Sequence, residues 1–266
     1  MSIIIGLSGK KQSGKDTAAN IIHGIMLKKH NLVKDYNISG DGSLQILTTN
    51  QHGKEGWGEF DINRKDEAFL SYAEQNMYPF VKNYSFADAL KSICVHLFDI
   101  PAECVYGTEE EKNQEMEHLF WEYMPKFENT PFARKVLMPH DSVAHYRWKD
   151  GPMTAREFMQ FFGTDLMRQM HEDIWLNACM RTIDHEQPLV AIIKDVRFKN
   201  EFEEILSRDN SYLVRLERGM YQDSHSSETD LDDYMDQFHY IVDNSGNRSL
   251  DQLRDNIEKI MGELLF

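Results

Sequence analysis

One short stretch near the start of the chain constrains the fold more than any other. Residues 9–17 read GKKQSGKDT, which matches the phosphate-binding loop pattern G-x-x-x-x-G-K. Residues 2–8 before it are typical of a strand, and residues 15–30 have the apolar spacing of a helix. In this context the glycines let backbone N–H groups turn inward, and the helix N-terminus and Lys15 add positive charge. The alternative is a glycine-rich turn before an ordinary helix. It does not explain why the cation Lys15 lies at the N-terminal end of the helix, where the helix dipole makes a positive charge unfavourable. We therefore expect a nucleotide phosphate to bind at Gly9, Gln12, Ser13, Gly14, Lys15, Asp16 and Thr17.

The residue after Lys15 departs from the commonest form of this pattern. Many phosphate-loop proteins carry a serine or threonine there as a direct Mg²⁺ ligand, whereas this chain carries Asp16. Asp16 can serve the metal through a water or steer an acceptor group, and Thr17 can bond a phosphate oxygen. The other interpretation of Asp16 is a first-turn carboxylate favoured by the helix dipole. Both interpretations stay open.

Composition and charge exclude several classes of protein. The chain has 266 residues and a net charge of −15, so we do not expect non-specific binding to the phosphate backbone of nucleic acids. No apolar run is long enough for a membrane span, and the first residues do not form a signal peptide. Together with three cysteines without metal spacing, this predicts a cytoplasmic protein. Trp57 and Trp121 are expected to be exposed, which makes a homodimer one candidate arrangement.

The order of predicted elements indicates the fold class. Strand-like runs fall at residues 2–8, 188–194, 211–217 and 238–242, mostly as continuous apolar runs that suit buried parallel strands. Helical segments are predicted at residues 15–30, 88–98, 154–182 in two pieces, 199–207 and 249–265, with a capping box at Thr154 and Glu157. Strands that alternate with helices predict an α/β fold, three layers with a central parallel sheet, over residues 1–266 as one domain.

Two stretches do not fit this core. Residues 39–65 and 135–151 have the patches of hairpins, and residues 109–124 are predicted to be a charged helix. We expect residues 39–65 and 109–151 to be insertions that cover a substrate site, since such insertions often do. Dimer contacts or decoration are the alternatives.

A second group of candidate residues follows an apolar strand. The run LVAII ends in Lys194, Asp195, Val196 and Arg197. Because ligands of open α/β sheets bind at the carboxyl ends of strands, Asp195 is a candidate for ordering metal-bound water or the acceptor, with Arg197 beside it. The alternative is that Asp195 caps the next helix and Arg197 is solvated.

A third group lies on the predicted helix from residue 154. Arg156 and Gln160 are four residues apart and share a helix face, so they could contact a phosphate and a base edge. Residues 163–165, Gly-Thr-Asp, are predicted to break the helix and to offer backbone N–H groups to an anion. A solvated face plus an N-cap is the alternative, and Trp175 is favoured as a core residue over a stacking platform.

With these pieces in order, the chain resembles the bacteriophage deoxynucleoside monophosphate kinases, a branch of the phosphate-loop nucleoside monophosphate kinase superfamily. The resemblance covers most of the chain. It is carried by LSGKKQSGKDT at 7–17, FADALK at 86–91, REFMQFFGTDL at 156–166 with Trp175, DVRFKNE at 195–201, VRLERG at 214–219, HSSE at 225–228 and VDNSGN at 242–247. It implies that MgATP gives its γ-phosphoryl group to a deoxynucleoside 5′-monophosphate, in the host cytoplasm if the protein is viral.

The resemblance also implies roles for particular residues. Lys15 and the loop backbone would hold the ATP phosphates, while Lys11 and Arg197 would bridge the donor and acceptor phosphates. Lys91 and Arg156 would bind the acceptor monophosphate. Gln160, Gly163, Thr164 and Trp175 would line the nucleoside pocket, with Glu201 nearby. Asn244 would contact the adenine side. Arg215 and Arg218 fall where such kinases carry a lid, and the polar run at residues 217–236 would be part of that lid.

Three other classes of protein compete with this interpretation. A related small-molecule kinase such as a dephospho-coenzyme A kinase shares the core and differs in the acceptor pocket. A phosphate-loop switch or motor is disfavoured because Asp16 replaces the hydroxyl and no N-K-x-D motif is present. A binding module with an inactive loop would bind ATP without turnover.

Overall fold

A computed structural model describes residues 2–10, 12–49, 53–64, 66–125, 133–137, 144–218, 231–244 and 250–265, with backbone only at 133–137 and 144–148. Lys11 and residues 219–230 and 245–249 lie outside the described residues. Backbone contacts divide the chain into two compact units, residues 1–86 with 179–266, and residues 87–178.

The first unit is built on a parallel five-stranded sheet in the order β12-β11-β1-β10-β5. The central strand is β1, and it pairs in parallel with β10 on one side and β11 on the other. The bounds are β1 Ile3–Ser8, β5 Val81–Tyr84, β10 Val190–Val196, β11 Ser211–Glu217 and β12 Tyr240–Asp243. This confirms the predicted α/β fold and the four predicted strands, while β5 was not predicted.

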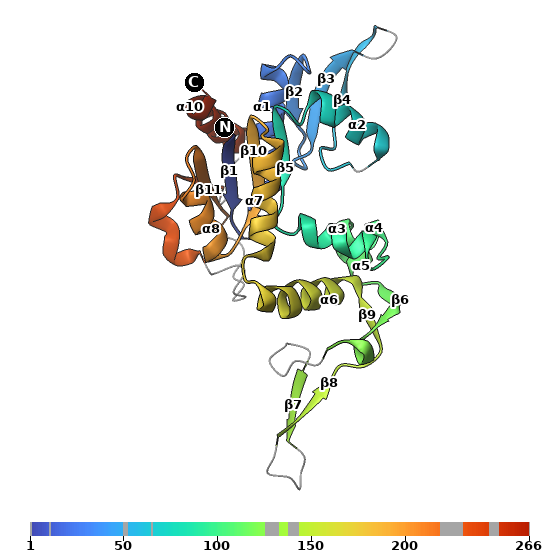
Figure 1. The fold of residues 1–266 in the computed structure, drawn as a ribbon. Coiled ribbons are helices and arrows are strands. Elements are labelled where there is room, and N and C mark those ends of the chain that lie inside the picture. Colours follow the sequence, from blue (N-terminus) through green and yellow to red (C-terminus); the bar gives the residue numbers. More distant parts are fainter. Residues whose placement is uncertain are drawn as a thin grey trace. The chain divides into compact units, whose positions relative to one another are not determined.

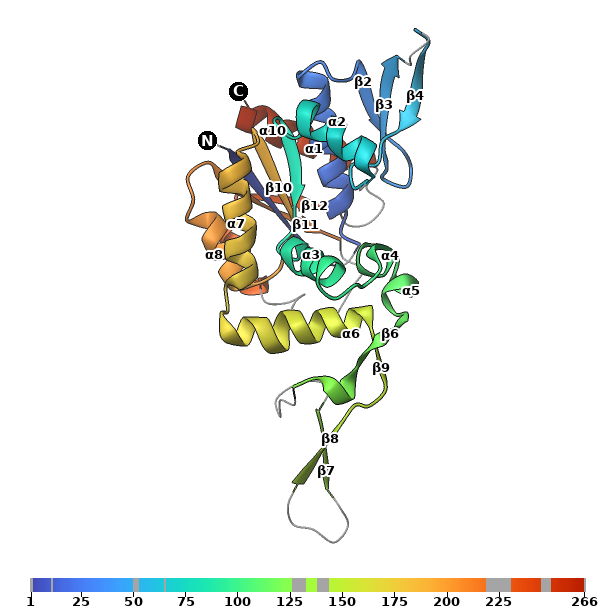
Figure 2. The same cartoon turned by 45° about the vertical axis from the view of Figure 1, so that its right-hand side comes forward.

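Helices cover both faces of this sheet (Figure 1 and Figure 2). The helices α1 and α10 lie on one face, and α8 and the first unit's part of α7 lie on the other. Their bounds are α1 Lys15–Lys29, α7 Ile174–Glu186, α8 Lys199–Leu206 and α10 Leu250–Leu265, with the 3₁₀ helix η3 Asp232–Gln237 before β12. The arrangement places the loop after β1 at the carboxyl edge of the sheet, where such sheets bind ligands.

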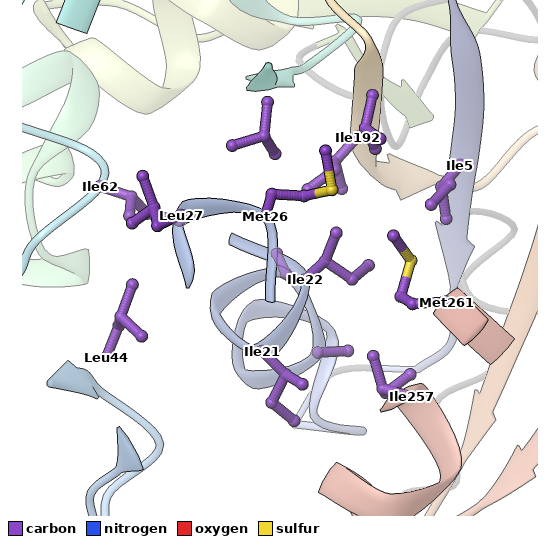
Figure 3. Packing of buried hydrophobic residues seen from close by; sticks show 14 of the residues in the cluster. Ile5, Ile21, Ile22, Met26, Leu27, Leu44, Ile62, Ile192, Ile257 and Met261 are labelled. Carbon is purple, nitrogen blue, oxygen red and sulfur yellow. The ribbon is translucent and has the colours of Figure 1, made fainter. Parts of the chain in front are cut away.

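The core of the first unit surrounds α1. Its residues Ile22 and Met26 are fully buried, and Figure 3 shows them with Ile192 of the sheet and Met261 of α10. Leu27 packs on the side of the helix where Leu44 and Ile62 of the inserted segment lie. Burial of apolar surface on several sides fixes α1, and with it the loop that it follows.

The segment between α1 and β5 forms a small antiparallel sheet and a helix. Its strands are β2 Asp35–Ile38, β3 Leu44–Thr49 and β4 Glu55–Glu59, in the order β2-β3-β4, followed by α2 Glu67–Asn76. The pairing of β3 with β4 confirms the predicted hairpin in residues 39–65. Trp57 on β4 is 53% exposed, as predicted.

The second unit is mainly helical with two small antiparallel pairs. Its elements are α3 Asp88–His96, α4 Ala102–Tyr106, α5 Glu109–Lys112, β6 Glu115–Phe120, η1 Trp121–Tyr123, β7 Ala133–Leu137, β8 Ala144–Trp148, β9 Pro152–Thr154, α6 Ala155–Gln160 and η2 Phe161–Arg168. The pairing of β7 with β8 confirms the predicted hairpin. Thr154 and Glu157 form the predicted capping box at the start of α6.

Three predictions for this unit are wrong. Residues 109–124 are not one helix, because α5 ends at Lys112 and β6 then pairs with β9. Residues 163–165 do not break the helix, because they lie inside η2, a π-helix that continues α6. Trp121 is 6% exposed and belongs to this unit's core, so it offers no interface.

In the part of the chain that the structure describes, no helix is both long enough and apolar enough to cross a membrane.

Candidate active site

The loop between β1 and α1 has the backbone of a phosphate cradle. Gly9 and Gly14 have positive φ angles of 150° and 101°, which glycine adopts without strain, and Gln12 between them has a left-handed φ of 62°. A Cβ atom on Gly9 would overlap the carbonyl oxygen of Leu216 in β11, so this position requires glycine. The loop therefore curls tightly against β11 and ends at the first turn of α1, where N–H groups without helical partners attract anions.

Lys15 curls back over this loop. Its Nζ donates to the carbonyl oxygens of Gly9 and Lys10, the latter at 2.8 Å. The hydroxyl of Ser13 is buried and has no hydrogen-bond partner among the described residues. A buried hydroxyl without a partner is unfavourable, and a phosphate oxygen would satisfy it. The cradle and this hydroxyl fit a bound phosphate.

Asp16 and Thr17 occupy the first turn of α1. The Asp16 side chain is 89% exposed, and its Oδ1 lies 3.8 Å from Nζ of Lys194. The hydroxyl of Thr17 lies against Gly42 in the turn between β2 and β3. Asn20 of α1 contacts the same turn, because its Nδ2 donates to the carbonyl oxygen of Gly42 at 2.8 Å. The predicted insertion thus contacts the phosphate-loop helix directly.

The described residues offer no preformed metal cage. Among them no group of three or more histidine, cysteine, aspartate or glutamate side chains could hold a metal ion. Mg²⁺ usually binds through one or two carboxylates together with substrate phosphates and waters, so the exposed Asp16 fits an ion that arrives with ATP.

Two residues from distant parts of the chain contact the loop from the other side. Arg218 donates from Nη1 to the carbonyl oxygen of Gln12 at 3.2 Å. Asn244, which follows β12, donates from Nδ2 to the carbonyl oxygen of Ser13 at 3.0 Å and lies beside Gly14. The structure therefore brings Arg218 and Asn244 to the phosphate loop, on which the resemblance placed ATP.

Asp195 and Arg197 stand at the carboxyl end of β10. Asp195 accepts a hydrogen bond from the hydroxyl of Ser85 at 2.8 Å, and it does not cap α8, whose N-cap is Phe198. Glu201 is buried, and its Oε2 accepts from the backbone N–H groups of Arg197 and Phe198 at 2.9 and 3.1 Å. Glu201 thus fixes the backbone that carries the exposed Arg197.

The second unit holds the residues predicted to bind the acceptor phosphate. Lys91 on α3 has its Nζ 5.3 Å from the ring centre of Tyr106 in α4, a cation–π distance. Arg156 on α6 donates from Nη2 to Glu109 of α5 at 2.6 Å, and its buried Nε has no partner among the described residues. Both cations are therefore held by the α4–α5 segment.

The residues predicted to line a nucleoside pocket follow on α6 and η2. Gln160 and Thr164 are exposed, whereas Gly163 is buried against Leu90. Trp175 is 5% exposed, and its Nε1 donates to the carbonyl oxygen of Gly163 at 2.9 Å. Trp175 therefore serves as a core residue that fixes the π-helical turn, the interpretation that the sequence favoured.

Sequence reasoning missed several residues of this region. Nζ of Lys194 lies near Asp16 and also donates to Asn63 at 3.0 Å. The sequence feature that could have indicated Lys194 is its position as a charged residue at the end of an apolar strand. Ser85 had no signal because β5 was not predicted. Arg215, which the resemblance placed in a lid, instead lies in β11 and is buried.

Comparison with known proteins places these features in a family. A family model described as deoxynucleotide monophosphate kinase matches residues 3–257. The deoxynucleoside-5′-monophosphate kinase of Escherichia phage T5 is 38% identical over 87 residues, which span 31% of this chain and 34% of the phage protein. The "Putative deoxynucleotide monophosphate kinase" of Acanthamoeba polyphaga mimivirus is 29% identical over 164 residues, 55% of this chain and 67% of that protein. Because the family model covers nearly the whole chain, from β1 to α10, the predicted resemblance is confirmed, and the chain belongs to the deoxynucleotide monophosphate kinase family.

Proposed function

We propose that this chain transfers the γ-phosphoryl group of MgATP to a deoxynucleoside 5′-monophosphate, giving ADP and the deoxynucleoside diphosphate. The observation that carries the proposal is the phosphate loop of a chain in this kinase family, with Lys15 folded over the loop and the Ser13 hydroxyl buried beside it. The chain as a whole is acidic, so the cations near this loop mark a local anion site.

The proposed work of the protein is binding and orientation. Lys15 would exchange its two carbonyl acceptors for phosphate oxygens, because a bond between two charged groups is stronger than one to a neutral carbonyl. Arg218 and Asn244 would hold the donor nucleotide at the loop, and Arg197 would neutralise charge on the transferred group. Lys91 and Arg156 would bind the acceptor monophosphate. An ionised acceptor phosphate needs no strong general base.

Magnesium has a limited place in this proposal. When bound, Mg²⁺ neutralises charge on the β- and γ-phosphates, and Asp16 with Thr17 are the residues that would hold it or its waters. Asp195 is proposed to orient the acceptor or such a water, and its bond to Ser85 fixes the carboxylate for this role.

A panel of acceptors tests the proposal. The purified chain is incubated with γ-labelled ATP and each of the four deoxynucleoside monophosphates, the ribonucleoside monophosphates, dephospho-coenzyme A, or no acceptor. We expect label in at least one deoxynucleoside diphosphate, and none with the Lys15→Met variant. Label in coenzyme A would support the alternative kinase, and label only in inorganic phosphate would support an ATPase. Either result would refute the proposal.

A further inference from the structure

A buried arginine lies directly behind the phosphate loop. Arg215 of β11 stands opposite Ser8 of β1 in the strand register, at the point where β1 enters the loop. Its side chain is 6% exposed. Nη1 donates to the Ser8 hydroxyl at 3.1 Å, and Nη2 donates to Oδ1 of Asp232 at 3.0 Å.

The second oxygen of Asp232 reaches the loop itself. Its Oδ2 lies 3.8 Å from Nζ of Lys10. The backbone carbonyl of Lys10 accepts hydrogen bonds from Nζ of Lys15 at 2.8 Å and from N–H of Ser13 at 3.1 Å. A chain of contacts therefore runs from the buried arginine through Asp232 and Lys10 to Lys15 and Ser13.

The charge of Arg215 makes this chain of contacts rigid. A guanidinium removed from water requires a carboxylate or several acceptors, because an uncompensated buried charge is strongly unfavourable. The buried Nε of Arg215 has no hydrogen-bond partner in the described part of the chain, so Asp232 and Ser8 carry this compensation. Without Asp232, Arg215 would have to move or capture another acceptor at the loop.

We propose that Arg215 and Asp232 are positioning residues of the phosphate loop, which hold Lys10 and, through the bond of its carbonyl to the Ser13 N–H, keep the loop backbone in the curled form that receives ATP phosphates. This inference rests on the proposed function of the loop. Neither residue contacts the nucleotide in this proposal. They act by fixing the loop before ATP binds, so that little ordering is needed on binding.

The Asp232→Asn variant tests the inference, because it keeps the shape of the side chain and removes its charge. ATP affinity is measured by calorimetry, and KM for each substrate by the labelled-ATP assay. We expect the Kd and KM for ATP to rise about tenfold, the scale of losing one charged hydrogen bond, with the acceptor KM nearly unchanged. Asp233→Asn is the matched control, since Asp233 is the next residue of η3 and is exposed like Asp232, while the ion pairs with Arg215 and Lys10 belong to Asp232. It should behave like the unaltered chain.

A double variant separates positioning from general stability. If the loss arises from an uncompensated Arg215, then Arg215→Met added to Asp232→Asn should restore part of the ATP affinity. If Asp232→Asn lowers Tm but leaves the Kd for ATP unchanged, the inference is overturned. Equal losses of ATP affinity in Asp232→Asn and in the control Asp233→Asn would also overturn it. If Asp232→Asn does not fold, Lys10→Met keeps the Arg215–Asp232 pair and should still weaken ATP binding, and an unchanged Kd would refute the inference. Absence of ATP binding by the unaltered chain would refute the proposed function itself.

Discussion

A buried histidine in α1 predicts how the stability of the fold depends on pH. His23 is 1% exposed, and its Nε2 lies 3.0 Å from Oδ1 of Asn83 in β5. The pKa of His23 is lowered from its usual 6.5 to about 4: burial is the largest cause, the hydrogen bond to Asn83 opposes the shift, and the charge of Lys194 adds a smaller lowering. His23 is therefore neutral in the folded protein.

The sign and size of the effect follow from this pKa. Between pH 6.5 and pH 4 the unfolded chain binds a proton that the folded chain does not, so the free energy of unfolding falls as the pH falls. The loss is about 2 kcal/mol at about pH 5 and approaches about 3 kcal/mol near pH 4, at 1.36 kcal/mol per pKa unit. Most of this window lies above the pH at which carboxylates protonate.

Urea unfolding at a series of pH values between about 7.5 and 4.5 measures the effect. The His23→Gln variant is the comparison, because glutamine does not titrate in this range. Burial also lowers the pKa values of His30 and His239, but these groups titrate in both proteins and their contribution cancels in the difference. A variant with the same pH slope as the unaltered chain, or an NMR titration of His23 near pH 6.5, would refute the reasoning.

Three further predictions concern the loop, the acceptor site and the packing of α1. Lys15→Ala should lower kcat about a hundredfold or more, the scale of losing one well-placed transition-state partner, and unchanged turnover would remove the loop from the mechanism. Arg156→Ala should raise KM for the monophosphate in the labelled-ATP assay and leave ATP affinity nearly intact, and the reverse result would exchange the two proposed sites. Gly24→Ala should lower Tm, because its Cβ would overlap the Tyr36 ring. Overpacking of about 1–3 kcal/mol exceeds the gain of at most about 1 kcal/mol from helix propensity, so a raised Tm would contradict the packing described.

The sheet could be predicted where the strands are long and apolar. The strands β1, β10 and β11 are continuous runs buried on both faces, so their residues alone indicate parallel pairing. The strand β5 was not predicted, because it is short and carries the polar residues Lys82 and Asn83. These polar side chains are paired with Glu186 and His23, and such long-range partners are not visible in a local pattern.

Predictions failed in the second unit for a related physical reason. The charged residues 109–124 satisfy a helical pattern, yet the capping box at Thr108 and Glu111 starts only one turn of helix. The residues that follow pair with β9 further along the chain, at Glu115 with Thr154 and Phe120 with Pro152. Tertiary pairing of this kind overrides local propensity.

The candidate site divides in the same way. The curled backbone of the described loop residues could be predicted, because the glycines and Lys15 act through local backbone geometry. Lys194, Ser85 and Asp232 could not, because each matters only through a partner that folding brings near, namely Asp16, Asp195 and Arg215.

The π-helical turns of η2 make the length of this segment as important as its composition. A π-helix contains one residue more per hydrogen-bonded turn than an α-helix. Here the carbonyl oxygen of Gly163 also accepts a hydrogen bond from the indole N–H of Trp175. Removing a single residue between 161 and 168 would allow the segment to rewind as an ordinary α-helix. Residues inside the segment, such as Thr164, would then take new directions, whereas the helix before and after the segment would stay close to its present register, because the wider π-helical turns already absorb the extra residue. A change in chain length of one residue would therefore redirect Thr164 on the surface proposed to meet the base, without any substitution among the residues that form that surface.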